Sequence, residues 1–176
     1  MVRAAFLVGL TMVSGAACAQ DSASSANPLD AVPDKLPFNI PYGEPISLAR
    51  AQAAVTAAVT EADKHGWPLN VAVLDSGANL VAFSRMDGAQ LASIAISQHK
   101  ARAAVKFRRP TKAFEDAVQK SDYKYLLTFD DIFTSRGGIP LIEDGKLVGA
   151  IGCSGGTGSQ DEVACLAGAR IINKID

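Results

Sequence analysis

The stretch Ile139-Pro-Leu-Ile-Glu-Asp-Gly-Lys-Leu-Val-Gly-Ala-Ile-Gly152 decides the fold. Its two largely apolar runs, 139–143 and 146–152, flank the dipeptide Asp144-Gly145. Asp and Gly adopt positive φ at low cost and suit a type I′ turn of two residues, which joins only antiparallel strands. The stretch therefore predicts a β-hairpin.

A second hairpin is predicted earlier in the chain. The apolar runs 69–74 and 80–83 are joined by Asp75-Ser-Gly-Ala-Asn79, in which Asp, Gly and Asn all favour a turn. Two such hairpins supply four strands, and the two strands of each hairpin pair in an antiparallel way.

Apolar periodicity predicts helices before and between the hairpins. Ser47 is a suitable N-cap for a helix that Gly66 ends, and apolar residues recur at three- and four-residue intervals between them. The same periodicity predicts a helix over 89–107, ended by Pro110, and a shorter one over 111–118.

A last helix is predicted over 159–173, where Ser159 and Glu162 match the S-x-x-E capping box. The stretch 121–138 is compatible with helix or loop. The resulting order is helix, hairpin, helices, hairpin, helix. This order predicts an α+β domain in which helices cover one antiparallel sheet.

Composition places the chain among globular proteins with a single folded domain. It has 176 residues, 48% hydrophobic and 20% charged, with a formal net charge of −1. Such a balance gives no basic field for nucleic acid. Three cysteines and two histidines are too few for a disulfide scaffold or a zinc site with several such ligands.

The N-terminus has the pattern of a secretory signal over residues 1–19. Arg3 precedes the apolar run 4–13, and Ala17-Cys18-Ala19 fits an A-x-A cleavage site. The run is shorter than the roughly 20 residues that span a bilayer. We therefore expect export to the periplasm or the cell exterior, with a lipidated Cys18 as the alternative.

Residues 20–46 form a proline-rich arm before the domain at 47–176. Five of the eight prolines lie here, and they exclude regular elements. Phe38, Ile40 and Tyr42 are apolar at alternate positions. The arm either lies extended on this domain or a neighbouring subunit, or is a partly ordered linker.

Gly152-Cys-Ser-Gly-Gly156 matches the G-x-S-x-G pattern of serine hydrolases. Both histidines precede Ser154, whereas that fold needs its base after the nucleophile, so the match argues for a structural turn. Asp161 and Glu162 in the first turn of the following helix also disfavour phosphate binding.

Cationic residues gather at the end of the second helix and just beyond it. Lysine and arginine suit carboxylates or phosphates, and a neutral imidazole can ligate iron. A haem presents both kinds of partner, whereas the alternative is a solvated helix face that complements the helix dipole. The set is His99, Lys100, Arg102, Lys106, Arg108 and Arg109.

Other candidate residues have two interpretations each. His65 is placed to cap a helix or to bind metal, and Met86 to fill a gap or act as a soft ligand. Cys153 and Cys165 are placed on a predicted strand and the following helix, either as a disulfide or as two buried thiols.

Five motifs resemble the GlcG/HbpS family of haem-binding proteins. They are Asn70-Val-Ala-Val-Leu-Asp-Ser-Gly77, Phe83-Ser-Arg-Met-Asp-Gly-Ala89, Lys100-Ala101, Gly137-Gly-Ile-Pro140, and Gly149-Ala-Ile-Gly-Cys-Ser-Gly155 with Asp161. The resemblance implies an α/β sandwich like profilin and small sensory domains. It also implies homo-oligomers and, for some members, a partner sensor protein.

These observations support three hypotheses. In the first, the protein binds haem or a related tetrapyrrole, with His99 or His65 as iron ligand and Arg102, Lys106 and Arg109 as propionate partners. In the second, it is an enzyme that acts on a small anionic metabolite near Asp75, Arg85 and Asp87. In the third, it is a structural scaffold without a ligand.

Overall fold

The structure is a computed structural model that describes residues 31–173. The signal predicted over 1–19, Cys18 and the first part of the arm lie outside these residues. In chain order the elements are α1 (Leu48–Lys64), β1 (Asn70–Asp75), β2 (Leu80–Arg85), α2 (Ala92–Phe107), α3 (Lys112–Lys120), the 3-10 helix η2 (Lys124–Thr128), β3 (Gly138–Glu143), β4 (Lys146–Ser154) and α4 (Gly158–Arg170).

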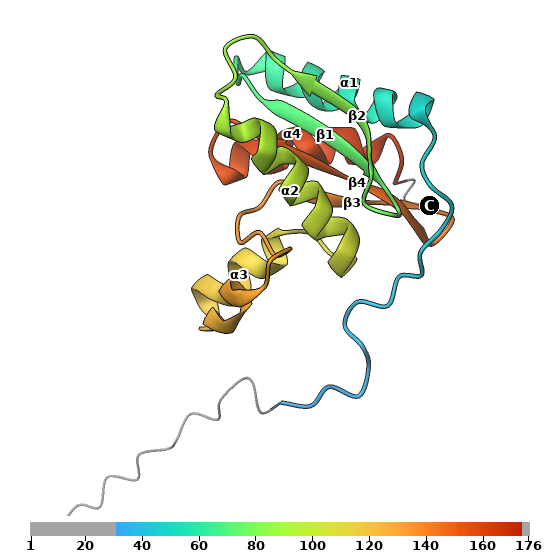
Figure 1. Cartoon of the computed structure of the whole chain (residues 1–176), viewed down its shortest axis with the longest axis vertical. Helices are drawn as coiled ribbons and strands as arrows, with labels where there is room; N and C mark the ends of the chain where they lie inside the picture. Colours follow the sequence, from blue (N-terminus) through green and yellow to red (C-terminus); the bar gives the residue numbers. More distant parts are fainter. Residues whose placement is uncertain (1–30, 174–176) are drawn as a thin grey trace, which may run out of the picture. The chain divides into compact units, whose positions relative to one another are not determined.

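The four strands form one sheet in the order β2-β1-β4-β3, and every neighbouring pair is antiparallel (Figure 1). Both predicted hairpins are confirmed. Asp144 and Gly145 have φ of 48° and 71°, the positive values that a type I′ turn needs. The predicted α+β class, an antiparallel sheet covered by helices, is confirmed as well.

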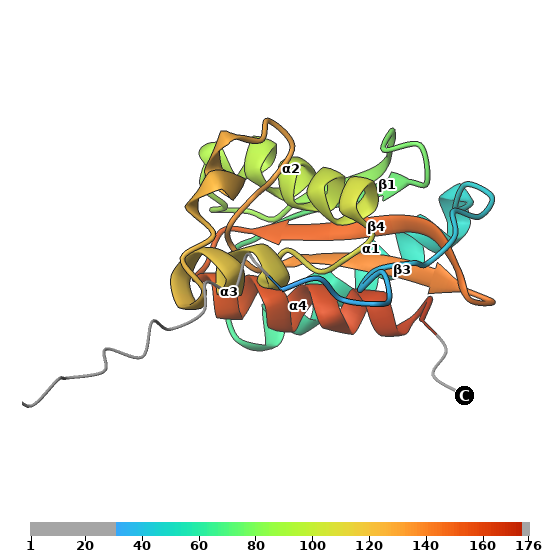
Figure 2. The same cartoon turned by 90° about the horizontal axis from the view of Figure 1, so that it is seen from below.

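Helices cover both faces of the sheet (Figure 2). Val71, Val73 and Ile151 pack in one apolar cluster with residues of α1 and α4. Ala72 and Leu74, which alternate with them along β1, pack in a second cluster with residues of α2. Successive side chains of a strand point to opposite faces of the sheet, so those of β1 pack alternately into the two clusters. This explains why the residues of β1 are nearly all buried.

Gly152 lets α2 approach β4 closely. A Cβ atom at this position would overlap the backbone carbonyl oxygen of Ser97 and lie 2.6 Å from the amide nitrogen of Ala101. The central part of α2 is therefore held against the sheet.

A disulfide joins Cys153 on β4 to Cys165 on α4, which settles the choice between a disulfide and two thiols.

Within residues 31–173, no helix combines the length and apolarity needed to cross a membrane.

The arm lies on its own domain from Pro41 to Ile46. The Leu147 amide donates to the Pro41 carbonyl at 2.8 Å, and the Gly43 amide donates to the Leu147 carbonyl at 2.8 Å. These bonds lie just beyond Gly149, where pairing of β4 with β1 ends. The arm therefore forms hydrogen bonds with backbone groups of β4 that lie beyond the end of β1.

The last helix starts earlier than predicted. Its capping box is formed by Thr157 and Gln160, not by Ser159 and Glu162, and the helix ends at Arg170 rather than Asn173. Thr157 accepts from the Gln160 amide, and the Gln160 side chain accepts from the Thr157 amide at 2.8 Å. The sequence T-x-x-Q satisfies the same capping rule two residues upstream.

Candidate functional site

The outward face of α2 carries three of the candidate residues, His99, Arg102 and Lys106. Their spacing of three and four residues places them within about 60° of one another around the helix axis. Residues such as Ala101 and Ala104 lie on the other side, buried against the sheet. We refer to His99, Arg102 and Lys106 together as the α2 face.

His99 is half-buried, and its ring meets Phe133 edge-on with 5.1 Å between ring centroids. Phe133 comes from the segment between η2 and β3, which the sequence left open between helix and loop. The imidazole of α2 is therefore adjacent to an aromatic ring from another segment, and the exposed Leu91 is the N-cap residue of the same helix.

Arg102 and Lys106 differ in whether they already form an ion pair. Lys106 forms an exposed ion pair with Asp131 at 2.5 Å. Arg102 is half-buried and forms no ion pair within residues 31–173. Its guanidinium is thus the charge on the α2 face that remains available for an anionic group.

Lys100 does not belong to a cationic surface, contrary to the sequence analysis. Its side chain is 2% exposed, and its Nζ lies 2.7 Å from Oδ2 of Asp161, whose side chain is 3% exposed. Burial raises the pKa of the Asp161 carboxyl, and the Lys100 ammonium opposes that rise. The pair links α2 to α4, which cover opposite faces of the sheet.

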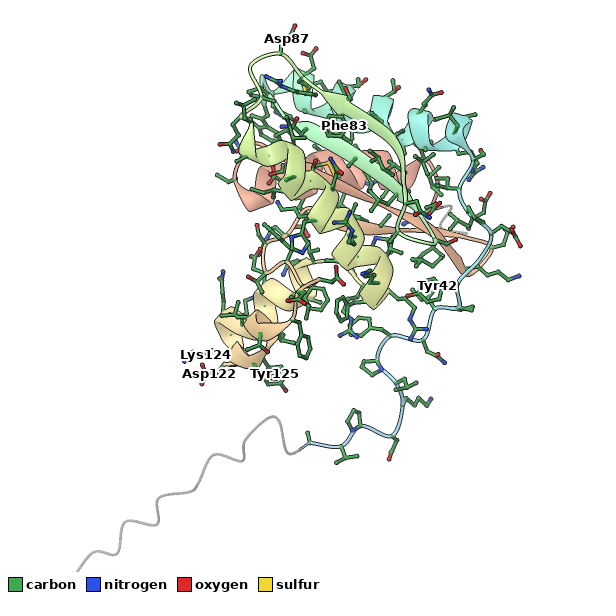
Figure 3. The ribbon with its side chains drawn as sticks, viewed as in Figure 1. Tyr42, Phe83, Asp87, Asp122, Lys124 and Tyr125 are labelled. Carbon is green, nitrogen blue, oxygen red and sulfur yellow. A yellow bond between two sulfur atoms is a disulfide. The ribbon has the colours of Figure 1, made fainter. Side chains whose placement is uncertain are left out.

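Arg108 and Arg109 hold the arm against α2. The Arg109 guanidinium lies 3.7 Å from the centroid of the Phe38 ring, and Arg108 donates to the Ile40 carbonyl at 3.1 Å. Tyr42 donates to carbonyls of the last turn of α2, the end of the helix beside which Figure 3 places it. Burial lowers the pKa of Arg109. The structure thus brings Arg109, an expected propionate partner, into contact with the arm.

His65 lies at the end of α1, where it is the C-cap residue. Its ring stacks on Trp67 with 4.3 Å between centroids, and its Nε2 lies 3.5 Å from Glu61. Because α1 and α2 cover opposite faces of the sheet, His65 and His99 are not brought together within one chain. Of the two expected iron ligands, only His99 is accompanied by Arg102 and Lys106.

The expected grouping of Asp75 with Arg85 and Asp87 is wrong. Asp75 closes the β1–β2 turn, where its carboxylate accepts the amides of Gly77 and Asn79. Arg85 pairs with the first residue of β1, at the other end of the hairpin. Asp87 follows in the loop after β2 (Figure 3). The turn therefore accounts for Asp75, while Arg85 and Asp87 are both exposed.

Ser154 is 4% exposed at the end of β4, as expected for a structural turn rather than a nucleophile.

Across residues 31–173, no three His, Cys, Asp or Glu side chains are grouped so that they could hold a metal ion.

Comparison with known proteins places this fold in a family. The family model described as "Haem degrading protein HbpS-like" matches residues 46–170. The chain belongs to the HbpS-like family.

Relatives of this HbpS-like chain include GlcG of Escherichia coli K12, which is 38% identical over 109 residues, covering 62% of this chain and 81% of GlcG. Among solved structures, Klebsiella pneumoniae protein ORFY is 30% identical with a TM-score of 0.69, covering 81% of this chain and all of that one. A PduOC:heme complex is 29% identical with a TM-score of 0.67, covering 73% of this chain and 96% of that one. The resemblance to the GlcG/HbpS family is confirmed.

Proposed function

We propose that this HbpS-like protein is an exported small-molecule-binding protein that takes haem or a related tetrapyrrole on the α2 face. A solved relative of the same fold is described as a complex with heme. In this chain, the observation that carries the proposal is the alignment of His99, Arg102 and Lys106 along one side of α2.

The residues of the α2 face fit a haem in their chemistry. His99 is the imidazole that would ligate iron, and Phe133 beside it offers an apolar surface to the macrocycle. Arg102 and Lys106 lie about 4.5 Å and 10 Å along the axis from His99, on one side of the imidazole. The Arg102 guanidinium offers a free cation to a propionate, whereas Lys106 would have to exchange its Asp131 partner for one. Bound haem would supply an iron centre that binds further ligands and exchanges an electron.

Export and assembly complete the proposal. The pattern at residues 1–19 supports delivery to the periplasm or the exterior, and the disulfide between Cys153 and Cys165 suits an oxidising compartment. We also propose that the protein forms homo-oligomers, and that a sensor protein is its partner. Size-exclusion chromatography with light scattering tests the first point, and a pull-down from membrane extracts tests the second.

A hemin titration tests the ligand. The purified protein should give a saturable Soret shift, and His99→Ala should weaken binding by about tenfold or more, which is 1.4 kcal/mol. His65→Ala is the matched control and should bind as the wild type does.

Arg102→Ala tests the propionate contact and should weaken binding several-fold. Arg170→Ala, which removes an exposed arginine at the end of α4, should not. If hemin gives no saturable shift, haem is not the ligand. If His99→Ala and His65→Ala bind hemin alike, the α2 face is not its site.

A further inference from the structure

A cavity lies away from the α2 face, at the end of α1. It has a volume of about 460 Å³ and is lined by Asp63, Gly66, Trp67, Pro68, Met86 and Asp87. These residues belong to the last turn of α1, the connection into β1 and the loop after β2. Cavities that hold small organic ligands span roughly 300–1,000 Å³, so this one is large enough.

The apolar walls of this cavity are held in place by contacts around them. The His65 imidazole stacks on the Trp67 indole with 17° between the ring planes, and Trp67 packs against the core beneath α1. Met86 accepts a hydrogen bond at its sulfur from the Leu69 amide at 3.4 Å. The indole and the thioether are therefore positioned before any ligand arrives.

The two carboxylates that line the cavity lack an ion-pair partner within the described part of the chain. Asp63 and Asp87 are exposed, and within residues 31–173 neither carboxylate forms an ion pair or accepts a hydrogen bond. Their neighbour Glu61 differs, since Lys64 and His65 both approach it and the Lys64 hydrogen bond lowers its pKa. Two free carboxylates thus flank an aromatic wall.

We propose that this cavity binds a small organic cation with apolar substituents, such as a quaternary or tertiary ammonium compound. An indole is the aromatic side chain that attracts cations most strongly. The carboxylates of Asp63 and Asp87 supply complementary charge, and Pro68 and Met86 contact the apolar substituents. A neutral ligand of the same shape would gain only the apolar part.

Trp67 reports on the cavity directly because it is the only tryptophan of the chain. Titration with choline, followed by tryptophan fluorescence, should give a saturable change. Its uncharged carbon analogue, 3,3-dimethylbutan-1-ol, should bind at least about tenfold more weakly, because it keeps the apolar contacts but loses the attraction of the positive charge to the indole and the carboxylates. Isothermal titration calorimetry provides a second readout that does not depend on fluorescence.

Asp63→Asn and Asp87→Asn should each weaken choline binding about two- to fivefold, the range expected of one exposed charge pair, and the double variant more. Neither carboxylate has a partner to lose, so these variants should fold and melt as the wild type does. Asp130→Asn, an exposed aspartate remote in sequence, is the matched control and should leave binding unchanged.

Three results would overturn the proposal: no saturable change with choline, equal binding of the uncharged analogue, or unchanged binding in the double variant. None of these results bears on the hemin titration, because Trp67 and His99 lie on different elements.

Discussion

Replacing Lys100 with methionine removes the ammonium of the buried ion pair and keeps a side chain of similar length. The remaining Asp161 carboxylate still accepts the Gly156 amide at 3.0 Å but loses the Lys100 contact at 2.7 Å. Both side chains are at most 3% exposed, so water does not replace the lost partner. Removing one member of such a pair costs about 3–5 kcal/mol. We expect Lys100→Met to lower the free energy of unfolding by that amount.

Adding Asp161→Asn to Lys100→Met removes the orphaned charge and keeps an acceptor for the Gly156 amide. The double variant should recover about 2 kcal/mol, because most of the cost lies in burying an unpaired charge. Urea unfolding at pH 7, followed by far-UV circular dichroism, measures both values. Lys124→Met breaks an ion pair that is 74% exposed on the lysine side, and it should leave stability nearly unchanged.

The stabilising role of the buried pair is refuted if Lys100→Met costs less than about 1 kcal/mol, well below the expected range. It is also refuted if the double variant is no more stable than the single one. Either result would mean that water reaches Asp161, or that the carboxylate is protonated in the folded protein.

Three further predictions concern stability. Replacing Cys153 and Cys165 with alanine should lower the free energy of unfolding by about 3 kcal/mol, from a sequence separation of 12; a urea midpoint equal to that of the wild type would contradict this. Gly152→Ala should cost at least about 1–3 kcal/mol, because its Cβ would overlap the backbone of α2; an unchanged melting temperature would show that α2 moves aside freely. The Arg136 hydrogen bonds hold the pKa of Glu115 below 4.5, so this carboxylate stabilises the fold above its unfolded pKa and ceases to do so as the pH falls through the lower folded value. The melting temperatures of the wild type and Glu115→Gln should therefore differ most near pH 7 and converge once the pH is below the lowered folded pKa. A difference that persists at lower pH would refute the assignment.

Local turn chemistry explains why the hairpins and the fold class were predictable. Asp144-Gly145 and the turn after Asp75 specify antiparallel pairing within a few residues, and no distant contact is needed. The position of the last cap was missed because Thr157 and Ser159 both satisfy the same rule, and only the hydrogen bonds of Gln160 distinguish them.

The site was less predictable because it depends on distant contacts. Lys100 is buried by a partner 61 residues away, and no local pattern marks it as different from Lys106 on the same helix. Phe133 lies in a stretch without periodicity, so its contact with His99 was not foreseen. The alternating apolar residues that include Phe38 indicated that the arm could pack on the domain. They did not indicate that Phe38 would contact Arg109, because that surface of the domain forms only when the chain folds.

The absorption spectrum of the protein recovered after export tests the central claim most directly. The wild type should carry a Soret band as isolated, and His99→Ala, exported in equal amount, should largely lose it while His65→Ala keeps it. A colourless wild type from haem-replete cells, or a Soret band of equal strength in His99→Ala, would contradict a tetrapyrrole on the α2 face.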